Sequence, residues 1–455
     1  MSTTWVITSK MVHGTMTTKA RLVVRGYEED EKVRSDSPTC NKENIRALLA
    51  IAVANDWSIK ALDIKAAFLQ GKSIDRDLYI KPPKECRKEN VIWKLKKVVY
   101  GLTDASRSWY LRVNEVLDKL GMKKSSIDNA VYTFGESELE GVMIIHVDDV
   151  LYFGSEKFLK EVIVPFKNTF KISREESTAF KYVGIDMCQS QDSIILQQKD
   201  YLESMNADLV APSLLKEKLR FAMDEEKKQF RQGVGQLGWI TNISRPETAF
   251  SFCTLSTVQR NPQMADFAKF KKAVKDMKMT DSFIKINKIA KSDFNIAVYS
   301  DASYGNLTDG SSQIGFIVFL YDKNGRSAPI SWASKKAKRV ARSTITAETL
   351  AATEAVDNAI VLKKMIGETT RREIGPITLY VDNKSLHDAV QTTNVLTERR
   401  LLIDMAALRE MVDRQELVVK WLTTENQLAD VLTKQGVNKQ KLISVLTSGR
   451  LPIEH

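Results

Sequence analysis

Hydrophobic and polar residues in the first part of the chain follow helical spacing in some segments and strand spacing in others. Residues 42–57 (KENIRALLAIAVANDW) carry apolar side chains at helical spacing, which predicts an amphipathic helix. Residues 105–121 predict a second helix that ends at Gly121. Residues 58–71 (SIKALDIKAAFLQG) predict a strand that runs into a turn. Helices and strands therefore alternate along this part of the sequence.

Two apolar runs surround an Asp-Asp pair in residues 141–154 (GVMIIHVDDVLYFG), and this pattern predicts a β-hairpin. The next segment, 156–170, predicts a helix that is broken or kinked at Pro165, because proline has no backbone N–H to donate. Residues 78–99 interleave lysines and arginines with apolar and aromatic side chains.

The pattern changes again in the second half of the chain. Residues 190–290 are mostly helical by spacing, and residues 280–293 (TDSFIKINKIAKSD) predict a polar, basic connector. Beyond it the sequence predicts three strands (FNIAVYSD, IGFIVFLYD and SAPISWAS), a helix at about 343–366 and a further strand (PITLYVD). We expect these elements to form a compact α/β unit of about 150 residues.

Composition indicates a globular protein with a polyanionic partner. The 455 residues suggest about three domains at roughly 150 residues each. Lysine and arginine total 68 against 57 acidic residues, a net charge of +11 that favours nucleic acid as a partner. Four scattered cysteines without a CxxC pair exclude a disulfide framework or zinc ribbon. There is no apolar run of membrane-spanning length and no apolar signal-peptide core, so we expect an intracellular protein without a membrane partner.

Acidic residues within apolar runs are the candidate chemistry of the first half. Asp63 interrupts an alternating strand, and Asp148 and Asp149 lie at the tip of the predicted hairpin. Adjacent aspartates are also common in ordinary turns, where they accept local backbone hydrogen bonds. Carboxylates gathered at one end of a sheet repel each other unless a cation neutralises them, and Mg²⁺ prefers oxygen ligands. Two such ions about 4 Å apart can activate a 3′ hydroxyl and stabilise a leaving pyrophosphate.

A second acidic set lies in the C-terminal unit. Asp301 and Asp382 end predicted strands, Glu348 lies near the start of a helix, and Asp430 lies in ENQLADVLTK, which we expect to be helical. Each residue alone fits a turn, a helix dipole or a solvated helix face. Their order along strand, helix, strand and helix can bring all four to one sheet edge. The basic run 333–343 (ASKKAKRVARS) could lie along a phosphate backbone or be a solvated loop.

A glycine pattern in residues 233–238 (GVGQLG) matches the GxGxxG spacing of a dinucleotide-binding turn. The preceding residues, DEEKKQFRQ, predict a charged helix instead of the buried strand that such a turn requires. We therefore expect these glycines to serve close helix packing.

Several segments in order carry a family likeness. They are KARLVVRGY (19–27), ALDIKAAFLQG (61–71), VYGLTDASRSWY (99–110), HVDDVLYFG (146–154), YVGIDM (182–187), ISRPETAF (243–250), YSDASYG, ISWASKK, the AET around Glu348, VDNKS and QLADVLTK. Together they resemble the reverse transcriptase and ribonuclease H region of a Ty1/copia-type retrotransposon Pol polyprotein. The resemblance covers nearly the whole chain.

The resemblance implies an α+β right-hand polymerase of fingers, palm and thumb, followed by an α/β ribonuclease H-like domain. We expect truncated fingers and the palm in residues 1–190, a mostly helical thumb and connection in 191–290, the ribonuclease H-like domain in 291–440 and a C-terminal tail in 441–455. The implied partners are an RNA template, a DNA primer, an RNA–DNA hybrid and deoxynucleoside triphosphates. The implied location is the cytoplasm, in a virus-like particle, with access to the nucleus.

The resemblance also assigns roles to individual residues. The polymerase metals, two Mg²⁺ ions with Mn²⁺ as a substitute, would be held by Asp63, Asp148 and Asp149. The two ribonuclease H metals would be held by Asp301, Glu348, Asp382 and Asp430. Lys19 and Arg21 would meet the incoming triphosphate. Phe68 would lie under the sugar and exclude a 2′ hydroxyl.

The chain departs from the family pattern at positions near the substrate. Asp104 stands where the family has a glutamine beside the nucleotide, and a carboxylate near a triphosphate is unfavourable unless it points away or meets a cation. Ser106 replaces a proline, His146 replaces the tyrosine before the Asp-Asp pair, and Ala66 replaces an asparagine. These departures leave two alternatives to a polymerase-nuclease: a degenerate element product that retains the fold and nucleic-acid binding without efficient polymerase activity, or a cellular ribonuclease H with an inert N-terminal half.

Overall fold

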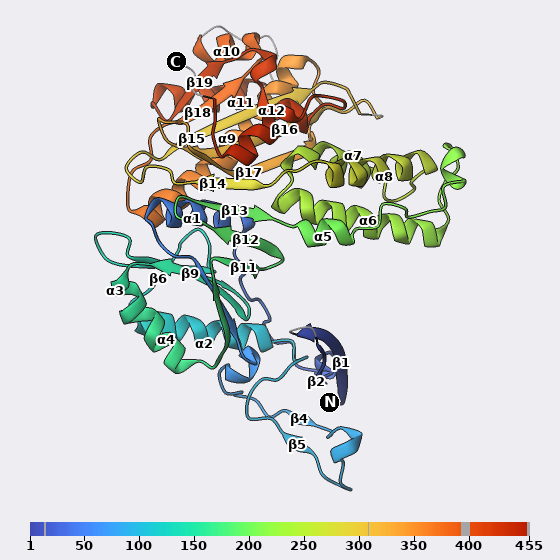
Figure 1. Cartoon of the computed structure of the whole chain (residues 1–455), viewed down its shortest axis with the longest axis vertical. Helices are drawn as coiled ribbons and strands as arrows, with labels where there is room; N and C mark the ends of the chain where they lie inside the picture. The colour runs from blue at the N-terminus through green and yellow to red at the C-terminus, as the bar shows by residue number, and fades with distance from the viewer. Residues whose placement is uncertain (13–14, 308, 393–400, 453–455) are drawn as a thin grey trace. The chain divides into compact units, whose positions relative to one another are not determined.

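A computed structural model of the chain describes residues 1–12, 15–307, 309–392 and 401–452 (Figure 1). The chain forms two compact units. The first unit contains Met1–Asn41 and Lys60–Glu176, and the second contains Lys42–Ile59 and Ser177–His455. The predicted helix at 42–57 is present as α1 (Lys42–Ala54), and it belongs to the second unit although it lies early in the sequence.

The first unit is built on a six-stranded sheet with the strand order β10-β3-β9-β8-β7-β6. Its strands are β3 (Lys60–Ile64), β6 (Lys123–Lys124), β7 (Val131–Phe134), β8 (Gly141–His146), β9 (Asp149–Gly154) and β10 (Ile172–Ser177). Helix α2 (Ala105–Lys119) and the helical run from Glu156 to Thr169 pack on the sheet through a shared apolar core that includes fully buried Trp109 and Phe158. Burial of such large aromatic side chains stabilises the layer of helix on sheet.

The predicted hairpin is confirmed, and the following helical run changes type just before Pro165. β8 and β9 are antiparallel and pair His146 with Asp149 across the turn. The following run consists of α3 (Glu156–Phe158), a π-helical turn (Leu159–Ile163) and α4 (Val164–Thr169). The π turn ends two residues before Pro165, which lies in the first turn of α4 and cannot donate the i→i−4 hydrogen bond of a regular helix.

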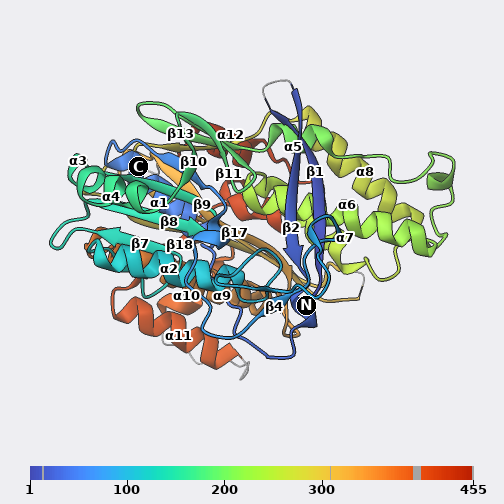
Figure 2. The ribbon, with the colours of Figure 1, turned by 90° about the horizontal axis from the view of Figure 1, so that it is seen from below.

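Two antiparallel ribbons complete the first unit. The long ribbon pairs β1 (Thr3–Val12) with β2 (Thr15–Val24), and the two strands run side by side in Figure 2. The short ribbon pairs β4 (Tyr79–Ile80) with β5 (Trp93–Lys94). Three 3-10 helices lie in the connections: η1 (Gly26–Glu28), η2 (Ala67–Gln70) and η3 (Lys84–Cys86).

The second unit begins with a four-stranded antiparallel sheet in the order β11-β12-β13-β14. Its strands are β11 (Ala179–Tyr182), β12 (Ile185–Gln189), β13 (Ser193–Gln197) and β14 (Ile284–Asn287). The predicted polar, basic connector at 280–293 therefore contains a short strand that the sequence analysis did not predict. Ile284 and Ile286 point into the core and alternate with Lys285 and Asn287, so the short segment has strand periodicity that its basic flanks obscured.

Helices fill most of the interval between β13 and β14, as predicted. They are α5 (Lys199–Ser204), α6 (Asp224–Ile243), α7 (Ala249–Thr257) and α8 (Met264–Met279), with 3-10 helices at Leu214–Lys216 and Pro246–Thr248. The GVGQLG segment lies inside α6, which confirms that it serves helix packing. A Cβ atom on Gly238 would lie 2.4 Å from the ring of Phe252, and one on Gly233 would lie 2.8 Å from that of Phe270.

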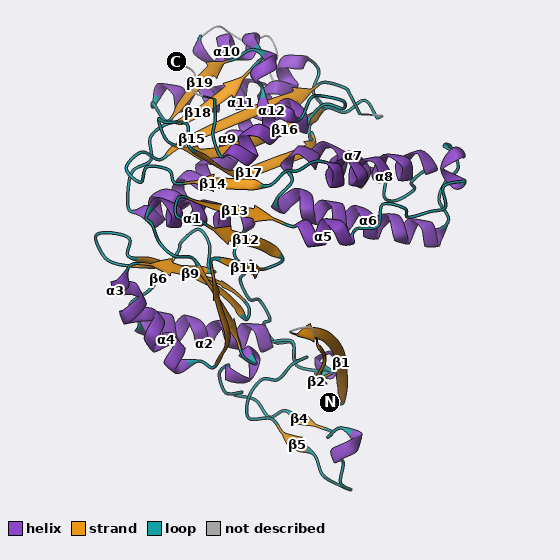
Figure 3. Ribbon diagram, viewed as in Figure 1, coloured by secondary structure: helices purple, strands orange, loops and turns teal. Residues whose placement is uncertain are grey.

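The last part of the second unit is a five-stranded sheet in the order β17-β16-β15-β18-β19, with helices packed against it (Figure 3). The strands are β15 (Asn295–Ser303), β16 (Gln313–Tyr321), β17 (Ser327–Lys336), β18 (Ile377–Val381) and β19 (Leu417–Trp421). The helices are α9 (Thr344–Thr370), α10 (Lys384–Gln391), α11 (Leu402–Asp413) and α12 (Gln440–Ser448). β15, β16 and β17 are antiparallel, whereas β18 and β19 continue the sheet in parallel with β15.

Two differences from the sequence-based expectations concern helix ends. The predicted helix at 343–366 is confirmed and continues to Thr370, and its N-cap Ser343 accepts a hydrogen bond from the Thr346 backbone N–H. The expected C-terminal tail includes most of α12, whose Leu442 and Leu446 are fully buried. In the described part of the chain, no helix combines the length and apolarity needed to cross a membrane.

Candidate active sites

The sheet of the first unit brings Asp63, Asp148 and Asp149 to one end of two paired strands. Asp63 on β3 is the direct cross-strand partner of Asp149 on β9. The β8–β9 turn contains Val147 at a positive φ of 57°, and the backbone N–H of Ile64 donates to the carbonyl of Asp148 over 2.9 Å. Carboxylates from two segments far apart in the sequence therefore lie close together, because the register of β3 and β9 pairs Asp63 with Asp149 and the turn holds Asp148 beside them.

The carboxylates of this acidic group repel one another. Burial, followed by the charges of Asp148 and Asp63, raises the pKa of Asp149 to about 6, while Arg174 acts in the opposite direction. A divalent cation would remove this repulsion, and carboxylate oxygens are the ligands that Mg²⁺ prefers. The residue types therefore suit the expected metal, whereas among the described residues a group of at least three acidic, histidine or cysteine side chains with ligand atoms within 4.8 Å of one another occurs only at Asp301, Glu348 and Asp382.

Ser173 is a residue of this group that sequence reasoning missed. Its hydroxyl on β10 donates to the Asp63 carboxylate, with an Oγ–Oδ2 distance of 2.6 Å. The Ser173 Oγ also lies 3.0 Å from the Asp63 backbone carbonyl oxygen. Ser173 thus fixes the orientation of Asp63. Nothing in the local sequence marks this serine, because the contact spans 110 residues.

Aromatic and cationic side chains lie beside the acidic group. Lys19 and Arg21 are two residues apart on β2 and so share one face of the ribbon. The Arg21 guanidinium lies 5.9 Å from the centre of the Tyr100 ring, and the Phe68 ring meets the same tyrosine edge-on at 5.1 Å. Burial raises the pKa of Tyr100, the charge of Arg21 opposes this shift, and the charges of Asp148 and Asp63 add to it. Tyr100, not singled out from sequence, therefore links the predicted nucleotide-side residues to the carboxylates.

Asp104 lies at the N-terminus of α2, where it meets a cation. The Arg76 guanidinium donates to Asp104 Oδ2 over 2.7 Å and to Glu29 Oε1 over 2.6 Å. Among the described residues, the other oxygen of Asp104 is buried without a hydrogen-bond partner. The Asp104 carboxylate therefore meets a cation, as the sequence analysis required, and it shares this cation with Glu29.

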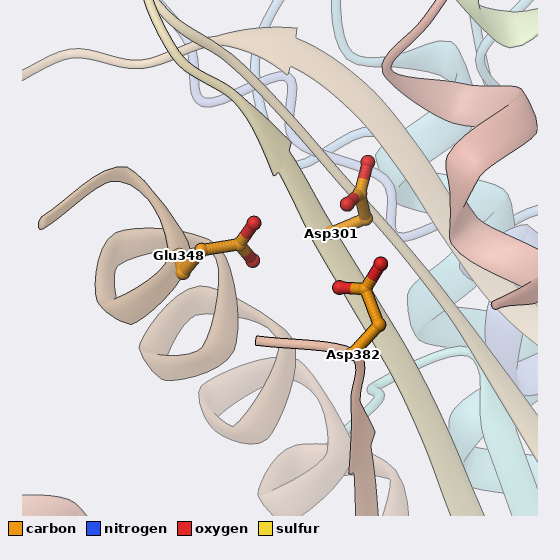
Figure 4. Close-up of side chains that lie close together, drawn as sticks. All are labelled: Asp301, Glu348 and Asp382. Atoms are coloured by element: carbon orange, nitrogen blue, oxygen red, sulfur yellow. The ribbon is translucent and has the colours of Figure 1, made fainter. Parts of the chain in front are cut away.

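The second acidic group lies at the carboxyl ends of two inner strands of the five-stranded sheet. Asp301 lies on β15, Asp382 directly follows β18, and Glu348 points toward both from the first turns of α9 (Figure 4). One oxygen from each of the three carboxylates lies within 4.8 Å of the others. β15 and β18 are parallel neighbours, so residues at their carboxyl ends meet at the same edge. The predicted convergence of these three residues therefore occurs.

Asp430 joins this group through a lysine. It lies in a 3-10 helix (Leu428–Leu432) and not in the expected α-helix. The Lys434 ammonium lies 2.7 Å from Asp430 Oδ1 and 3.3 Å from Asp301 Oδ1. Thr433 also donates to the Asp301 carboxylate. Sequence reasoning missed Thr433 and Lys434, although both lie in the same QLADVLTK motif as Asp430.

This second group is more deeply buried than the first. Asp301 is 1% exposed and Glu348 4% exposed, and burial raises the pKa of both carboxyl groups, with neighbouring carboxylates adding to the effect. Lys434 opposes the shift in each case. Glu348 Oε2 is buried without a hydrogen-bond partner among the described residues. A buried, unpartnered carboxylate oxygen facing two others fits a divalent cation.

The surroundings of this group include an indole and a basic run. Trp421, at the end of β19, donates its indole N–H to the carbonyl of Asp382 over 2.9 Å, and its side chain remains exposed. The basic run 333–343 is largely paired within the protein. Its ion pairs are Lys335–Glu354, Lys336–Asp309 and Arg339–Asp404. Lys338 and Arg342 have no ion pair within the described residues, so fewer charges are available to phosphates than the sequence suggested.

Comparison with known proteins places these sites in a family context. Residues 1–211 match the family model described as reverse transcriptase (RNA-dependent DNA polymerase). The retrovirus-related Pol polyprotein from transposon RE1 of Arabidopsis thaliana is 27% identical over 439 residues, which cover 91% of this chain and 29% of that protein. The transposon Ty1-NL2 Gag-Pol polyprotein of Saccharomyces cerevisiae is 26% identical over 454 residues, covering 92% of this chain and 25% of that protein. The chain thus spans less than a third of the length of these relatives.

Two solved structures share the fold. A foamy viral protease-reverse transcriptase in complex with double-stranded DNA matches with a TM-score of 0.56 and 12% identity, covering 93% of this chain and 66% of that chain. A foamy viral protease-reverse transcriptase with an RNA/DNA hybrid matches with a TM-score of 0.53 and 12% identity, covering 92% and 50%. The expected fold is therefore confirmed: a polymerase followed by a ribonuclease H-like domain. Residues 1–211 match the reverse transcriptase family, and over most of its length the chain is similar to Ty1/copia-type retrotransposon Pol polyproteins.

Proposed function

We propose that the chain is an RNA- and DNA-directed DNA polymerase that also cleaves the RNA strand of RNA–DNA hybrids. The observation that carries this proposal is the presence of two separate carboxylate groups, one in each compact unit, in a chain similar to retrotransposon Pol proteins. The nucleic-acid partners of the foamy viral proteins support the same substrates here, namely template, primer and hybrid.

In the polymerase reaction, Asp63, Asp148 and Asp149 would hold two Mg²⁺ ions. Bound there, the ions would activate the primer 3′ hydroxyl and neutralise the departing pyrophosphate. Ser173 would keep the Asp63 carboxylate in a fixed orientation. Lys19 and Arg21 on β2 would bind the triphosphate of the incoming nucleotide.

The Phe68 ring would exclude a 2′ hydroxyl by its bulk. Its edge contact with Tyr100 supports this role, because the contact restricts the ring to one position. The protein would therefore select deoxynucleotides by shape and would need no hydrogen bond to the sugar for this purpose.

In the nuclease reaction, Asp301, Glu348, Asp382 and Asp430 would hold the second pair of ions, which would activate a water molecule for attack on the RNA phosphodiester. Mn²⁺ would serve as a substitute for Mg²⁺ at both sites. Trp421 would hold the Asp382 backbone in place through its indole N–H. Lys338 and Arg342 are the candidates for phosphate contacts beside this site, since the other basic residues of the run are paired.

The domain assignment is also a proposal. Residues 1–190 would supply fingers and palm, 191–290 the thumb and connection, and 291–440 the nuclease domain. The α6–α8 helices between two strands of the four-stranded sheet support a thumb in the second interval. We further propose that the protein acts in the cytoplasm, within a virus-like particle, and that its product reaches the nucleus.

A paired assay on the purified chain tests the function. The protein is incubated with a DNA primer on an RNA template and, separately, with a labelled RNA–DNA hybrid, in Mg²⁺ and in chelator. We expect primer extension and hybrid cleavage in Mg²⁺, and neither in chelator. Hybrid cleavage without any primer extension would refute the polymerase assignment and favour a ribonuclease H with an inert N-terminal half. Loss of both, with nucleic-acid binding retained, would favour a degenerate element product.

A further inference from the structure

The strongest unassigned feature is a partly buried cluster of three charged side chains in the first unit. Arg76 donates to both oxygens of Glu29, from Nε over 2.6 Å and from Nη2 over 3.3 Å, and donates from Nη1 to Asp104 over 2.7 Å. The side chains of Arg76, Glu29 and Asp104 are 19%, 5% and 15% exposed. One guanidinium therefore pairs with two partly buried carboxylates at once, in the forked geometry that arginine provides, while the second oxygen of Asp104 has no hydrogen-bond partner among the described residues.

Each member of the cluster belongs to a different segment of the proposed nucleotide pocket. Glu29 follows η1, which begins two residues after the β2 strand that carries Lys19 and Arg21. Arg76 lies in the loop that leaves η2, the short helix that carries Phe68. Asp104 precedes α2 and stands four residues after Tyr100. Arg76 thus connects the three segments that carry the candidate phosphate-binding residues, the candidate sugar-selecting Phe68 and Tyr100.

Backbone hydrogen bonds join the end of β2 to the segment before α2, beside the cluster. The Val24 N–H donates to the Tyr100 carbonyl over 2.8 Å, and the Gly26 N–H donates to the Gly101 carbonyl over 3.1 Å. A Cβ atom on Gly26 would lie 2.3 Å from the Gly101 oxygen, and Gly101 itself has a φ of 94°. The approach therefore requires glycine at both positions. Because the approach is so close, a shift at Asp104 would be transmitted to the end of β2.

The charge balance explains why the chain accepts an aspartate at this position. An unpaired Asp104 carboxylate would repel a bound triphosphate. With Arg76 in place, the Asp104 carboxylate is paired with a cation that it shares with Glu29, and Lys19 and Arg21 form no ion pair with it among the described residues. The cations on β2 therefore remain available to the nucleotide.

Resting on the polymerase function proposed above, we propose that Arg76 is a positioning residue of the nucleotide pocket. It fixes Asp104 and Glu29 against each other and thereby holds β2, the Phe68 loop and the start of α2 in one arrangement. The hypothesis that Asp104 simply impairs the pocket predicts that Asp104→Gln raises nucleotide incorporation. The ion cluster predicts the opposite, because the substitution removes one partner of a buried pair.

The test uses full-length Arg76→Met, Arg76→Lys, Asp104→Gln and the Arg76→Met/Asp104→Gln double variant. We expect Arg76→Met to raise the KM for the deoxynucleoside triphosphate by about tenfold or more while kcat changes less, since an uncompensated carboxylate weakens triphosphate binding. Asp104→Gln should raise KM less, and the double variant should be no worse than Arg76→Met because the repelling charge is gone. Arg76→Lys should recover part of the loss, since an ammonium keeps the charge without the fork.

Two controls separate this role from general damage to the fold. Hybrid cleavage by the same molecules reports on the second unit and should be unchanged. Arg220→Met removes an arginine of similar exposure (22%), paired with Glu226 over 2.7 Å, from the second unit, and it should leave the KM for the nucleotide unchanged. An Arg76→Met protein with unchanged KM, or singles whose effects simply multiply in the double variant, would overturn the proposal.

Hydrogen exchange provides a readout that does not depend on catalysis. Arg76→Met should accelerate exchange of the Val24, Gly26 and Glu29 amides, each of which donates a backbone hydrogen bond in the wild type. If the wild-type chain fails to extend primers, the proposed polymerase function fails, while faster exchange in the variant still supports the positioning role. Unchanged exchange at these amides would overturn the positioning role whatever the activity.

Discussion

Lys434→Met is the most informative perturbation of the second acidic group, because it removes the cation that bridges Asp301 and Asp430. The ammonium lies 2.7 Å from Asp430 and 3.3 Å from Asp301, whose side chain is 1% exposed. Removing one partner of a buried ion pair costs about 3–5 kcal/mol. Lys434 keeps 32% of its side chain exposed, so solvent screens part of the interaction. We therefore expect a loss of about 2–3 kcal/mol in the free energy of unfolding of the second unit without divalent cations.

Mg²⁺ should reverse most of this loss. A divalent ion held by the carboxylates would replace the missing positive charge, so saturating Mg²⁺ should reduce the difference between variant and wild type to below about 1 kcal/mol. Urea denaturation at pH 8, followed by tryptophan fluorescence in chelator and in Mg²⁺, measures both values. The variant should therefore gain more stability from Mg²⁺ than the wild type does.

A matched control is available in the same unit. Lys335 is 36% exposed and is paired with Glu354, which is itself 35% exposed and outside the acidic group. Lys335→Met should cost less than about 1 kcal/mol, with no dependence on Mg²⁺. If Lys434→Met were as stable as wild type in chelator, or if its loss were the same with and without Mg²⁺, the reasoning about charge compensation would be refuted.

Three further predictions concern pH, packing and sugar selection. The pKa values of Asp301 and Glu348 are raised in the folded state. The folded protein therefore loses stability as the pH rises through these values, because both groups must then ionise in a buried site. In chelator, Asp301→Asn should therefore gain stability relative to wild type between about pH 5 and pH 8 in urea titrations, and a constant difference would contradict this. Gly238→Ala should destabilise by about 1–3 kcal/mol through its clash with Phe252, whereas Gly235→Ala on the same helix, with nothing within 4 Å, should stabilise by up to about 1 kcal/mol. Thermal unfolding distinguishes the two, and equal effects would contradict the packing argument. Phe68→Ala should increase ribonucleotide incorporation at least tenfold relative to deoxynucleotide incorporation in primer extension, and an unchanged ratio would remove Phe68 from sugar selection.

Periodicity in the sequence was sufficient for the elements that carry the carboxylates. The alternating strand around Asp63, the apolar hairpin around Asp148 and the strands ending near Asp301 and Asp382 all occur as predicted. Their convergence follows from strand pairing: the end of β3 meets the start of its antiparallel neighbour β9, and the carboxyl ends of the parallel strands β15 and β18 lie side by side. Local pattern therefore predicts both the strands and the meeting of their acidic ends.

Contacts between distant segments could not be predicted in this way. Ser173 reaches Asp63 across 110 residues, and the sequence around it has no distinguishing pattern. Arg76 finds Glu29 and Asp104 only after three segments have packed together. The β14 strand is only four residues long and lies between basic residues, so its two buried isoleucines gave too short a signal.

The most direct test of two independent metal sites measures DNA synthesis and RNA cleavage on one substrate, with one variant for each site. A primer on an RNA template, labelled on both strands, reports DNA synthesis and RNA cleavage in the same tube. Asp148→Asn should abolish extension and leave cleavage of a preformed hybrid intact, and Asp301→Asn should do the reverse, because the two carboxylate groups lie in separate units. Loss of both reactions in either well-folded variant, or of neither, would contradict the existence of two independent metal sites.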